Sequence, residues 1–102
     1  MPQYLTMMKM TPRGRVEITG SLDRGQAINA ALSRIGVTRL DYYITLGAYD
    51  CVMLFDAPDE SAMGHALMII GTFGAVETNT MAVVSKEAYA RILDDIAGRG
   101  GE

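Results

Sequence analysis

The sequence contains few of the residues on which metal sites and disulfides depend. It has one cysteine, Cys51, and one histidine, His65, and it has no tryptophan. A single cysteine excludes an intramolecular disulfide, and with one histidine it cannot complete a usual structural zinc site. No glycine-rich loop joins a strand to a helix, as nucleotide-binding folds require. We therefore expect no metal and no cofactor.

Long apolar runs and an excess of positive charge are also absent. The longest strongly apolar helical run, residues 66–70, is far shorter than the roughly 20 residues that span a bilayer. The N-terminus has no basic, apolar leader. The formal net charge of −3 gives no general attraction for phosphate backbones or anionic lipid. We expect a cytoplasmic protein with neither a nucleic-acid nor a membrane partner.

The apolar content is nevertheless sufficient for one core. Of the 102 residues, 49% are hydrophobic and 21% are charged, an ordinary globular balance. We expect a single domain over residues 1–97 and a flexible tail over residues 98–102. Eight methionines are many for this length. Because methionine fills irregular gaps and adaptable surfaces, they indicate either core packing or an interface or ligand cavity.

Hydrophobic periodicity predicts an alternating order of strands and helices. The strand-like runs cover residues 3–10, 40–46, 49–57 and 75–84. Three helices are predicted. The first ends at Gly36, the second covers residues 60–73 with Asp59 as its N-cap, and the third runs from its N-cap Ser85 to Gly98. This order predicts an α+β, ferredoxin-like βαββαβ fold with a four-stranded antiparallel sheet and a C-terminal helix.

The two middle strands are predicted to form a hairpin around Gly47 and Ala48, a pair that suits a two-residue type II′ turn. The register that follows pairs Leu46 with Tyr49, Ile44 with Cys51, Tyr42 with Met53 and Leu40 with Phe55. One sheet face is then wholly apolar, and we expect the domain's own helices to fill it. The other face is mixed and pairs Thr45 with Asp50.

Residues 46–50, Leu-Gly-Ala-Tyr-Asp, resemble the Gly-x-Tyr-Asp turn of the GYD-domain family. The Thr-Pro-Arg-Gly loop at 11–14 and the strand entry at 74–78 also resemble it, and the likeness covers roughly residues 2 to 95. The resemblance implies a dimeric α/β barrel and no general biochemical activity. The hairpin also resembles the ligand-sensing domain of Lrp/AsnC regulators, which implies an oligomer with small-molecule pockets between subunits. The DNA-binding helices of those regulators are lacking.

Candidate ligand-binding residues lie mainly on the mixed face. They are Tyr43, Asp50, His65, Tyr49, Glu77 and Asn79. Asp50 is expected either to join Tyr43 at the mouth of a cavity or, as a carboxylate beside a hairpin, to accept hydrogen bonds from backbone N–H groups or a neighbouring hydroxyl. Glu77 and Asn79 alternate onto one face of the last strand, where they either join that patch or form a solvated edge. Tyr49 is placed on the apolar face, with its hydroxyl at the rim.

His65 is the one side chain whose unperturbed pKa lies near neutral. On its predicted helix it could be a general base or a haem ligand, or an ordinary surface or interface residue. Cys51 lies in the apolar register, where a thiol is usually inert packing, so we reject it as a nucleophile.

Two interpretations of function follow. The first is a non-enzymatic homo-oligomer that binds a small hydrophobic or amphipathic ligand at or near a subunit interface, or serves as an assembly module. The alternative is a cofactor-independent monooxygenase or isomerase acting on a small hydrophobic ring compound, by analogy with other dimeric α/β barrels. A buried His65 or Asp50 in an enclosed pocket favours the enzyme, and an exposed His65 favours binding. We favour the non-enzymatic interpretation.

Overall fold

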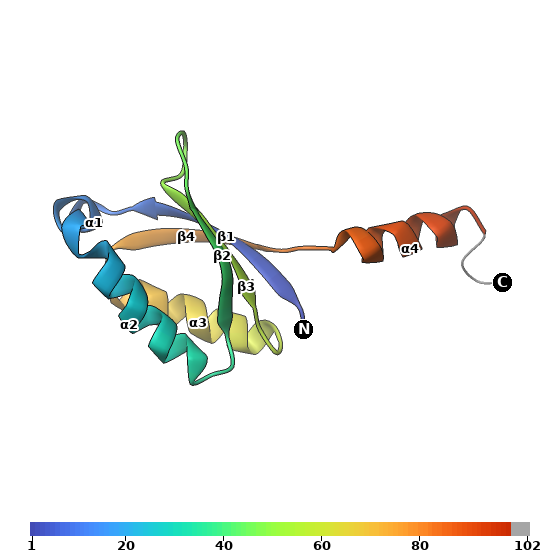
Figure 1. The fold of residues 1–102 in the computed structure, drawn as a ribbon, viewed down its shortest axis with the longest axis horizontal. Helices are drawn as coiled ribbons and strands as arrows, with labels where there is room; N and C mark the ends of the chain where they lie inside the picture. Colours follow the sequence, from blue (N-terminus) through green and yellow to red (C-terminus); the bar gives the residue numbers. More distant parts are fainter. Residues whose placement is uncertain (99–102) are drawn as a thin grey trace.

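The computed structural model describes residues 1–98 and has the predicted ferredoxin-like α+β order (Figure 1). The elements are β1 (Gln3–Met10), α1 (Pro12–Val16), the 3₁₀ turn η1 (Ile18–Gly20), α2 (Ser21–Ser33), β2 (Thr38–Ile44), β3 (Cys51–Asp56), α3 (Glu60–Thr72), β4 (Val76–Ala82) and α4 (Lys86–Ile96). The four strands form one antiparallel sheet in the order β2-β3-β1-β4. The predicted tail lies, from residue 99 onward, outside the described residues. No described helix combines the length and the hydrophobicity that crossing a bilayer requires.

Helices α2 and α3 pack against one face of the sheet, which we call the helix face (Figure 1). Side chains alternate along a strand, so every second residue of β1 points toward the helices. The core lies there and contains Tyr4, Met8, Cys51 and Phe55 from the strands and Leu32, Met63, Ala66 and Ile70 from the helices. The sheet and two helices thus bury one apolar layer.

The opposite face of the sheet, which we call the open face, is covered by none of the described helices. Its side chains are Leu5, Met7 and Lys9 of β1, Asp41 and Tyr43 of β2, Val52 and Leu54 of β3, and Glu77, Asn79 and Met81 of β4. Tyr43 is 61% exposed and Met81 is 44% exposed. Strand β1 carries apolar side chains on both faces, and the described helices cover only one of them.

The hairpin register agrees with the prediction in the middle of the strands. Ile44 pairs with Cys51 and Tyr42 pairs with Met53, as expected. The predicted pair of Leu40 with Phe55 is wrong, because a β-bulge makes Leu40 an extra residue and Arg39 pairs with Phe55 instead. This shift places Arg39 on the helix face.

The predicted two-residue turn is wrong as well. Strand β2 ends at Ile44 and β3 begins at Cys51, so residues 45–50 form a longer loop. The Thr45 N–H donates to the Asp50 carbonyl at 3.0 Å, and the Thr45 hydroxyl donates to the Tyr49 carbonyl at 2.6 Å. Gly47 has φ of +134°, a left-handed conformation that side-chain-bearing residues rarely adopt.

The two predicted N-caps, of α3 and α4, are confirmed. The Asp59 carboxylate accepts a hydrogen bond from the Ala62 N–H, and the Ser85 hydroxyl accepts one from the Ala88 N–H. The Thr-Pro-Arg-Gly stretch at 11–14, named as a loop, instead begins α1, and η1 follows it. Both are too short to show a helical period, so the sequence pattern gives no signal for them.

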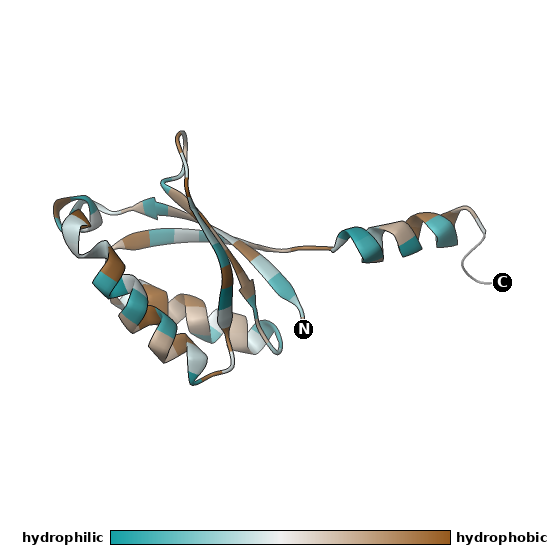
Figure 2. Ribbon diagram, viewed as in Figure 1, coloured by the Kyte–Doolittle hydropathy of each residue, from teal (hydrophilic) through white to brown (hydrophobic). Residues whose placement is uncertain are grey.

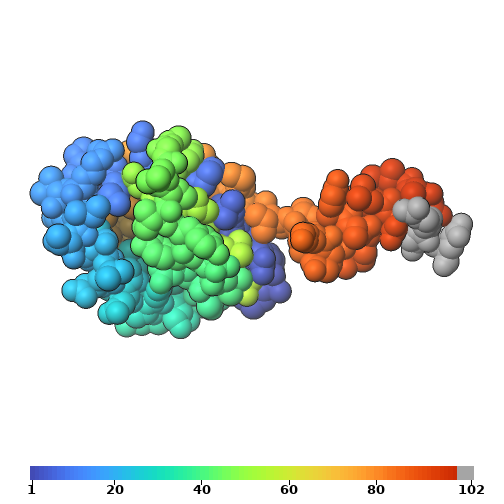
Figure 3. All heavy atoms as spheres, turned by 45° about the horizontal axis from the view of Figure 1, so that its top comes forward, coloured from blue at the N-terminus to red at the C-terminus, as the bar shows by residue number. Residues whose placement is uncertain are grey.

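Helix α4 projects away from the rest of the molecule, joined to β4 by the extended residues 83–85 (Figures 1 and 3). None of its residues is buried, and Ile96 is 76% exposed. The radius of gyration is 16.3 Å, whereas a compact domain of this length has roughly 13 Å. Figure 2 shows hydrophobic residues recurring along the helix. The large exposed side chains Tyr89, Ile92, Leu93 and Ile96 recur at helical spacing and form one stripe. This stripe meets no partner surface within the described chain.

Candidate functional site

The residues predicted to bind a ligand fall into three places. Tyr43, Glu77 and Asn79 lie on the open face, and Tyr49 and Asp50 lie in the adjoining loop. His65 lies on α3, which packs against the other side of the sheet, so it does not join the rest. The six residues therefore do not form one site within a single copy of the chain.

Tyr49 belongs with the open face rather than with the apolar face on which the sequence pattern placed it. Because β3 begins only at Cys51, Tyr49 lies in the loop, and its hydroxyl accepts a hydrogen bond from the Asn79 amide at 3.1 Å. This bond joins the hairpin loop to β4 across β1. Tyr43 lies on β2, at the opposite edge of the sheet from Asn79, so two strands separate these side chains on the open face.

The Asp50 carboxylate is bound to the backbone. Its Oδ2 accepts a hydrogen bond from the Met10 N–H at 2.7 Å, and the Asp50 N–H donates to the Met8 carbonyl at 2.8 Å. Of the two roles expected for Asp50, the acceptor for backbone N–H groups is the one the geometry confirms. The side chain ties the hairpin to the end of the central strand.

The Thr-Pro-Arg-Gly segment packs against the entry to β4 at the same end of the sheet. The Thr11 hydroxyl accepts from the Gly14 N–H at 3.1 Å and donates to the Gly74 carbonyl at 2.7 Å. The Thr11 N–H donates to the Ala75 carbonyl at 3.0 Å. A Cβ on Gly14 would lie 2.0 Å from the Ala75 oxygen, so only glycine fits there. The three segments that resemble the GYD family thus meet around residues 10–14, where hydrogen bonds join them.

His65 is exposed and lies in a shallow, open hollow on the outer side of α3 with Asp59, Ser61 and Met68. No enclosed pocket surrounds the imidazole within the described residues. This placement favours an ordinary surface role and fits the binding interpretation better than general-base catalysis. Among residues 1–98, no cluster of three or more His, Cys, Asp or Glu side chains could hold a metal ion.

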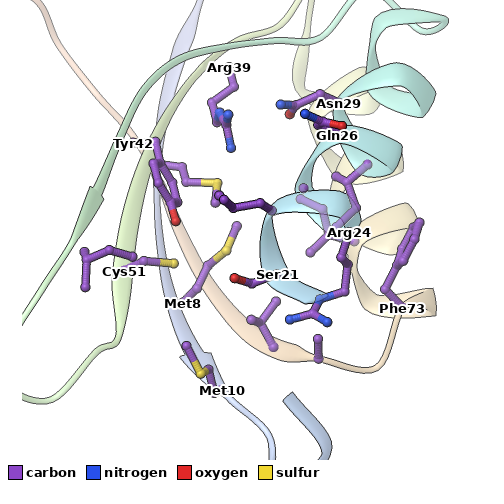
Figure 4. A pocket seen from close by; sticks show the side chains of 18 of the residues that line it. Met8, Met10, Ser21, Arg24, Gln26, Asn29, Arg39, Tyr42, Cys51 and Phe73 are labelled. Carbon is purple, nitrogen blue, oxygen red and sulfur yellow. The ribbon is translucent and has the colours of Figure 1, made fainter. Parts of the chain in front are cut away.

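The helix face is not filled, contrary to the expectation from its apolar pattern. A cavity of about 500 Å³ lies between the sheet and α2 (Figure 4). Its sheet wall is made of Met8, Met10, Tyr42, Ile44, Cys51, Met53 and Phe55. The α2 wall mixes the apolar Leu22 and Ile28 with small or polar residues, Ser21, Gly25, Gln26 and Asn29, and it leaves a gap to the sheet.

No sequence pattern indicated the charged residues of this cavity. Arg39 and Arg24 line it, and the Arg39 guanidinium lies over the Tyr42 ring, 4.8 Å from the ring centroid. Arg39 enters the helix face through the β-bulge, which no sequence signal predicted. The high methionine content was the one signal of an adaptable cavity, and Met8, Met10 and Met53 line it.

The thiol of Cys51 faces this cavity (Figure 4). Burial raises its pKa above the ordinary value, the Asp50 carboxylate raises it further, and Arg39 lowers it in part. A raised pKa keeps the sulfur protonated and weakly nucleophilic near neutral pH. This agrees with the expectation that Cys51 is inert packing.

The fold and these motif contacts define a GYD-type domain. The family model for the GYD domain matches residues 4–93, and the chain belongs to that family. The chain is also similar to the "Glutamine synthetase and cystathionine beta-lyase binding protein" of Thermus thermophilus. The two are 27% identical over 85 residues, which are 82% of this chain and 90% of that protein.

Proposed function

We propose that this chain is a non-catalytic protein-binding module that self-associates and, once assembled, binds a metabolic enzyme. The observation that carries the proposal is the amount of apolar surface without a cover, on the open face and on α4. Monomeric soluble proteins rarely leave such surfaces contiguous and exposed. The proposal therefore needs a partner for each of the two surfaces.

The open face is best matched by a second copy of itself. Leu5, Met7 and Leu54 lie at its centre and Tyr43 and Met81 lie at its periphery, so the face has an apolar middle. Two identical faces meeting about a two-fold axis bury both middles at once, which is the commonest form of homodimer. This assembly is also the one that the family resemblance implies.

Helix α4 supports the same conclusion independently. It has 11 residues, and isolated helices shorter than about 12–15 residues are marginal in water. An amphipathic helix of this length gains most of its stability by packing its apolar stripe against another surface. Because residues 83–85 carry it away from its own domain, we assign the stripe to the partner copy.

Self-association is tested by multi-angle light scattering at micromolar concentration. We expect the full chain to be a dimer or larger, and Ile92→Asp, which places a charge in the α4 stripe, to dissociate it. Lys86→Ala, at the start of the same helix and outside the stripe, is the matched control and should stay assembled. A wild-type chain that is a folded monomer would refute this part of the proposal.

The enzyme partner is proposed from the relative, whose name states that it binds glutamine synthetase and cystathionine beta-lyase. We propose that this chain binds an enzyme of the same kind. Biolayer interferometry with purified glutamine synthetase and cystathionine beta-lyase from the same organism tests it. We expect saturable binding by the assembled chain and weaker binding by Ile92→Asp. If the chain bound neither enzyme, the proposed enzyme partner would be refuted, whereas the proposed self-association would still stand.

A small-molecule site on the open face remains a second candidate. The Tyr49 hydroxyl and the Asn79 amide, with Glu77 two residues along β4 from Asn79, place polar groups among apolar ones, as ligand sites usually do. In a dimer these groups lie at or near the subunit interface. Native mass spectrometry of the purified chain tests this candidate, since a bound ligand appears as added mass. The monooxygenase or isomerase alternative is less well supported, because His65 is exposed and the Asp50 carboxylate is bound to Met10.

A further inference from the structure

We infer that the cavity between the sheet and α2 is a binding site for a small organic acid with an apolar body. The cavity lies on the helix face, on the opposite side of the sheet from the proposed self-association surface. None of the six candidate residues from the sequence lines it. The inference therefore does not depend on the proposed function.

The size and the walls of the cavity suit the apolar body of such a ligand. Its volume of about 500 Å³ lies within the range of roughly 300–1,000 Å³ that small-molecule pockets show. The wall is mostly aliphatic, aromatic and thioether, with Met8, Met53, Ile28, Phe55 and Ile70 among its residues. Flexible methionine side chains let such a wall adapt to the ligand that it covers.

The charged residues of the cavity are all of one sign. Among the residues that line it, Arg24 and Arg39 are cationic and none is Asp or Glu, although the whole chain has a net charge of −3. The positive charge of Arg39, which has no ion-pair partner within residues 1–98 and lies beside an apolar wall, selects for a negatively charged head group. Guanidinium groups bind carboxylates through two parallel hydrogen bonds, which adds geometric specificity.

Both guanidinium groups keep hydrogen-bond donors free for a ligand. Neither forms an ion pair within residues 1–98, and Arg24 donates only to the Glu17 carbonyl at the long distance of 3.4 Å. The Tyr42 ring holds the Arg39 guanidinium in place by a cation–π contact. Figure 4 shows Arg39, Gln26 and Asn29 toward one end of the cavity, whereas Arg24 and Ser21 lie apart from them, nearer to Met10. The end around Arg39 therefore provides a polar position for the head group, and the apolar wall accepts the body.

Two fluorescent probes that share one ring skeleton test the inference. The probe 8-anilino-1-naphthalenesulfonate is an anion with an apolar body, and N-phenyl-1-naphthylamine is the same skeleton without the sulfonate. The chain has no tryptophan to interfere with either signal. We expect the anion to bind more tightly, and octanoate but not octanol to displace it. Equal affinity for the two probes would overturn the inference.

Removal of the Arg39 charge tests the head-group contact. We expect Arg39→Gln to weaken binding of the anionic probe by about tenfold or more and to leave the neutral probe unchanged, since hydrogen bonds to charged groups are the stronger ones. Arg34→Gln, at the exposed end of α2 and outside the cavity, is the matched control. Unchanged binding of the anion by Arg39→Gln would contradict the assignment.

Filling the cavity tests its location. A Cβ on Gly25 would point toward Arg39, with the Nη1 atom at 4.0 Å and no closer neighbour, so Gly25→Leu fills the cavity without a backbone clash. Replacing a helical glycine also favours the helix, which argues against misfolding as the cause of any loss. We expect Gly25→Leu to abolish binding of the anion. Gly71→Leu on α3, where a Cβ meets nothing within 4 Å, should bind like wild type. Full binding by Gly25→Leu would place the probe elsewhere and refute the site.

Discussion

Asp50 and Met10 are joined by a hydrogen bond of 2.7 Å from the Met10 N–H to Asp50 Oδ2. Met10 ends β1 and Asp50 follows the hairpin loop, so this bond fixes the loop against the central strand. The next residue, Thr11, continues the same junction by donating to the Ala75 carbonyl. The end of β1 is thus held from both sides by residues of the GYD-like segments.

We expect Asp50→Ala to lower the free energy of unfolding by about 1–3 kcal/mol, because a part-buried backbone N–H loses its acceptor. Urea denaturation followed by circular dichroism measures this change. Asp41→Ala, an exposed carboxylate on the same sheet, is the control and should stay within about 0.5 kcal/mol of wild type. Equal stability of the two variants would show that Asp50 does not cap the strand.

Much of the fold could be predicted from the sequence, because the signals for it are local. Period-two and period-3.6 patterns gave the strands and the three longer helices, and Asp59 and Ser85 marked two helix starts. The hairpin register was right from residue 41 to 44. It failed at Leu40, because a β-bulge depends on how a strand pairs with its neighbour and leaves no fixed mark in the sequence.

The candidate cavity could not be predicted in the same way. It depends on the separation between α2 and the sheet, which periodicity does not encode, and on Arg39 reaching the helix face through the bulge. The backbone role of Asp50 could be predicted from the sequence, because carboxylates beside turns commonly accept hydrogen bonds from backbone N–H groups. The close approach of Gly14 to Ala75 joins segments far apart in the chain, and no local pattern reveals it.

We expect Gly14→Ala to destabilise the protein by about 3 kcal/mol or more, since its Cβ would lie 2.0 Å from the Ala75 carbonyl oxygen and backbone must move. Gly64→Ala on α3 is the matched control, because a Cβ there meets nothing within 4 Å. That control should gain up to about 1 kcal/mol from helix propensity. Thermal unfolding of both variants decides the order, and a Gly14→Ala variant as stable as wild type would disprove the close packing.

The raised pKa of the Cys51 thiol predicts a loss of stability in alkaline solution. Because the folded state favours the protonated thiol, this contribution is fully present below the ordinary thiol pKa and is lost as the pH rises through the raised value. We expect the difference in free energy of unfolding between wild type and Cys51→Ala to shift against wild type from about pH 8 to about pH 10. Subtracting the variant cancels the titration of lysines and tyrosines common to both. A difference that stays constant across this range would show that the folded protein does not hold the thiol in its neutral form.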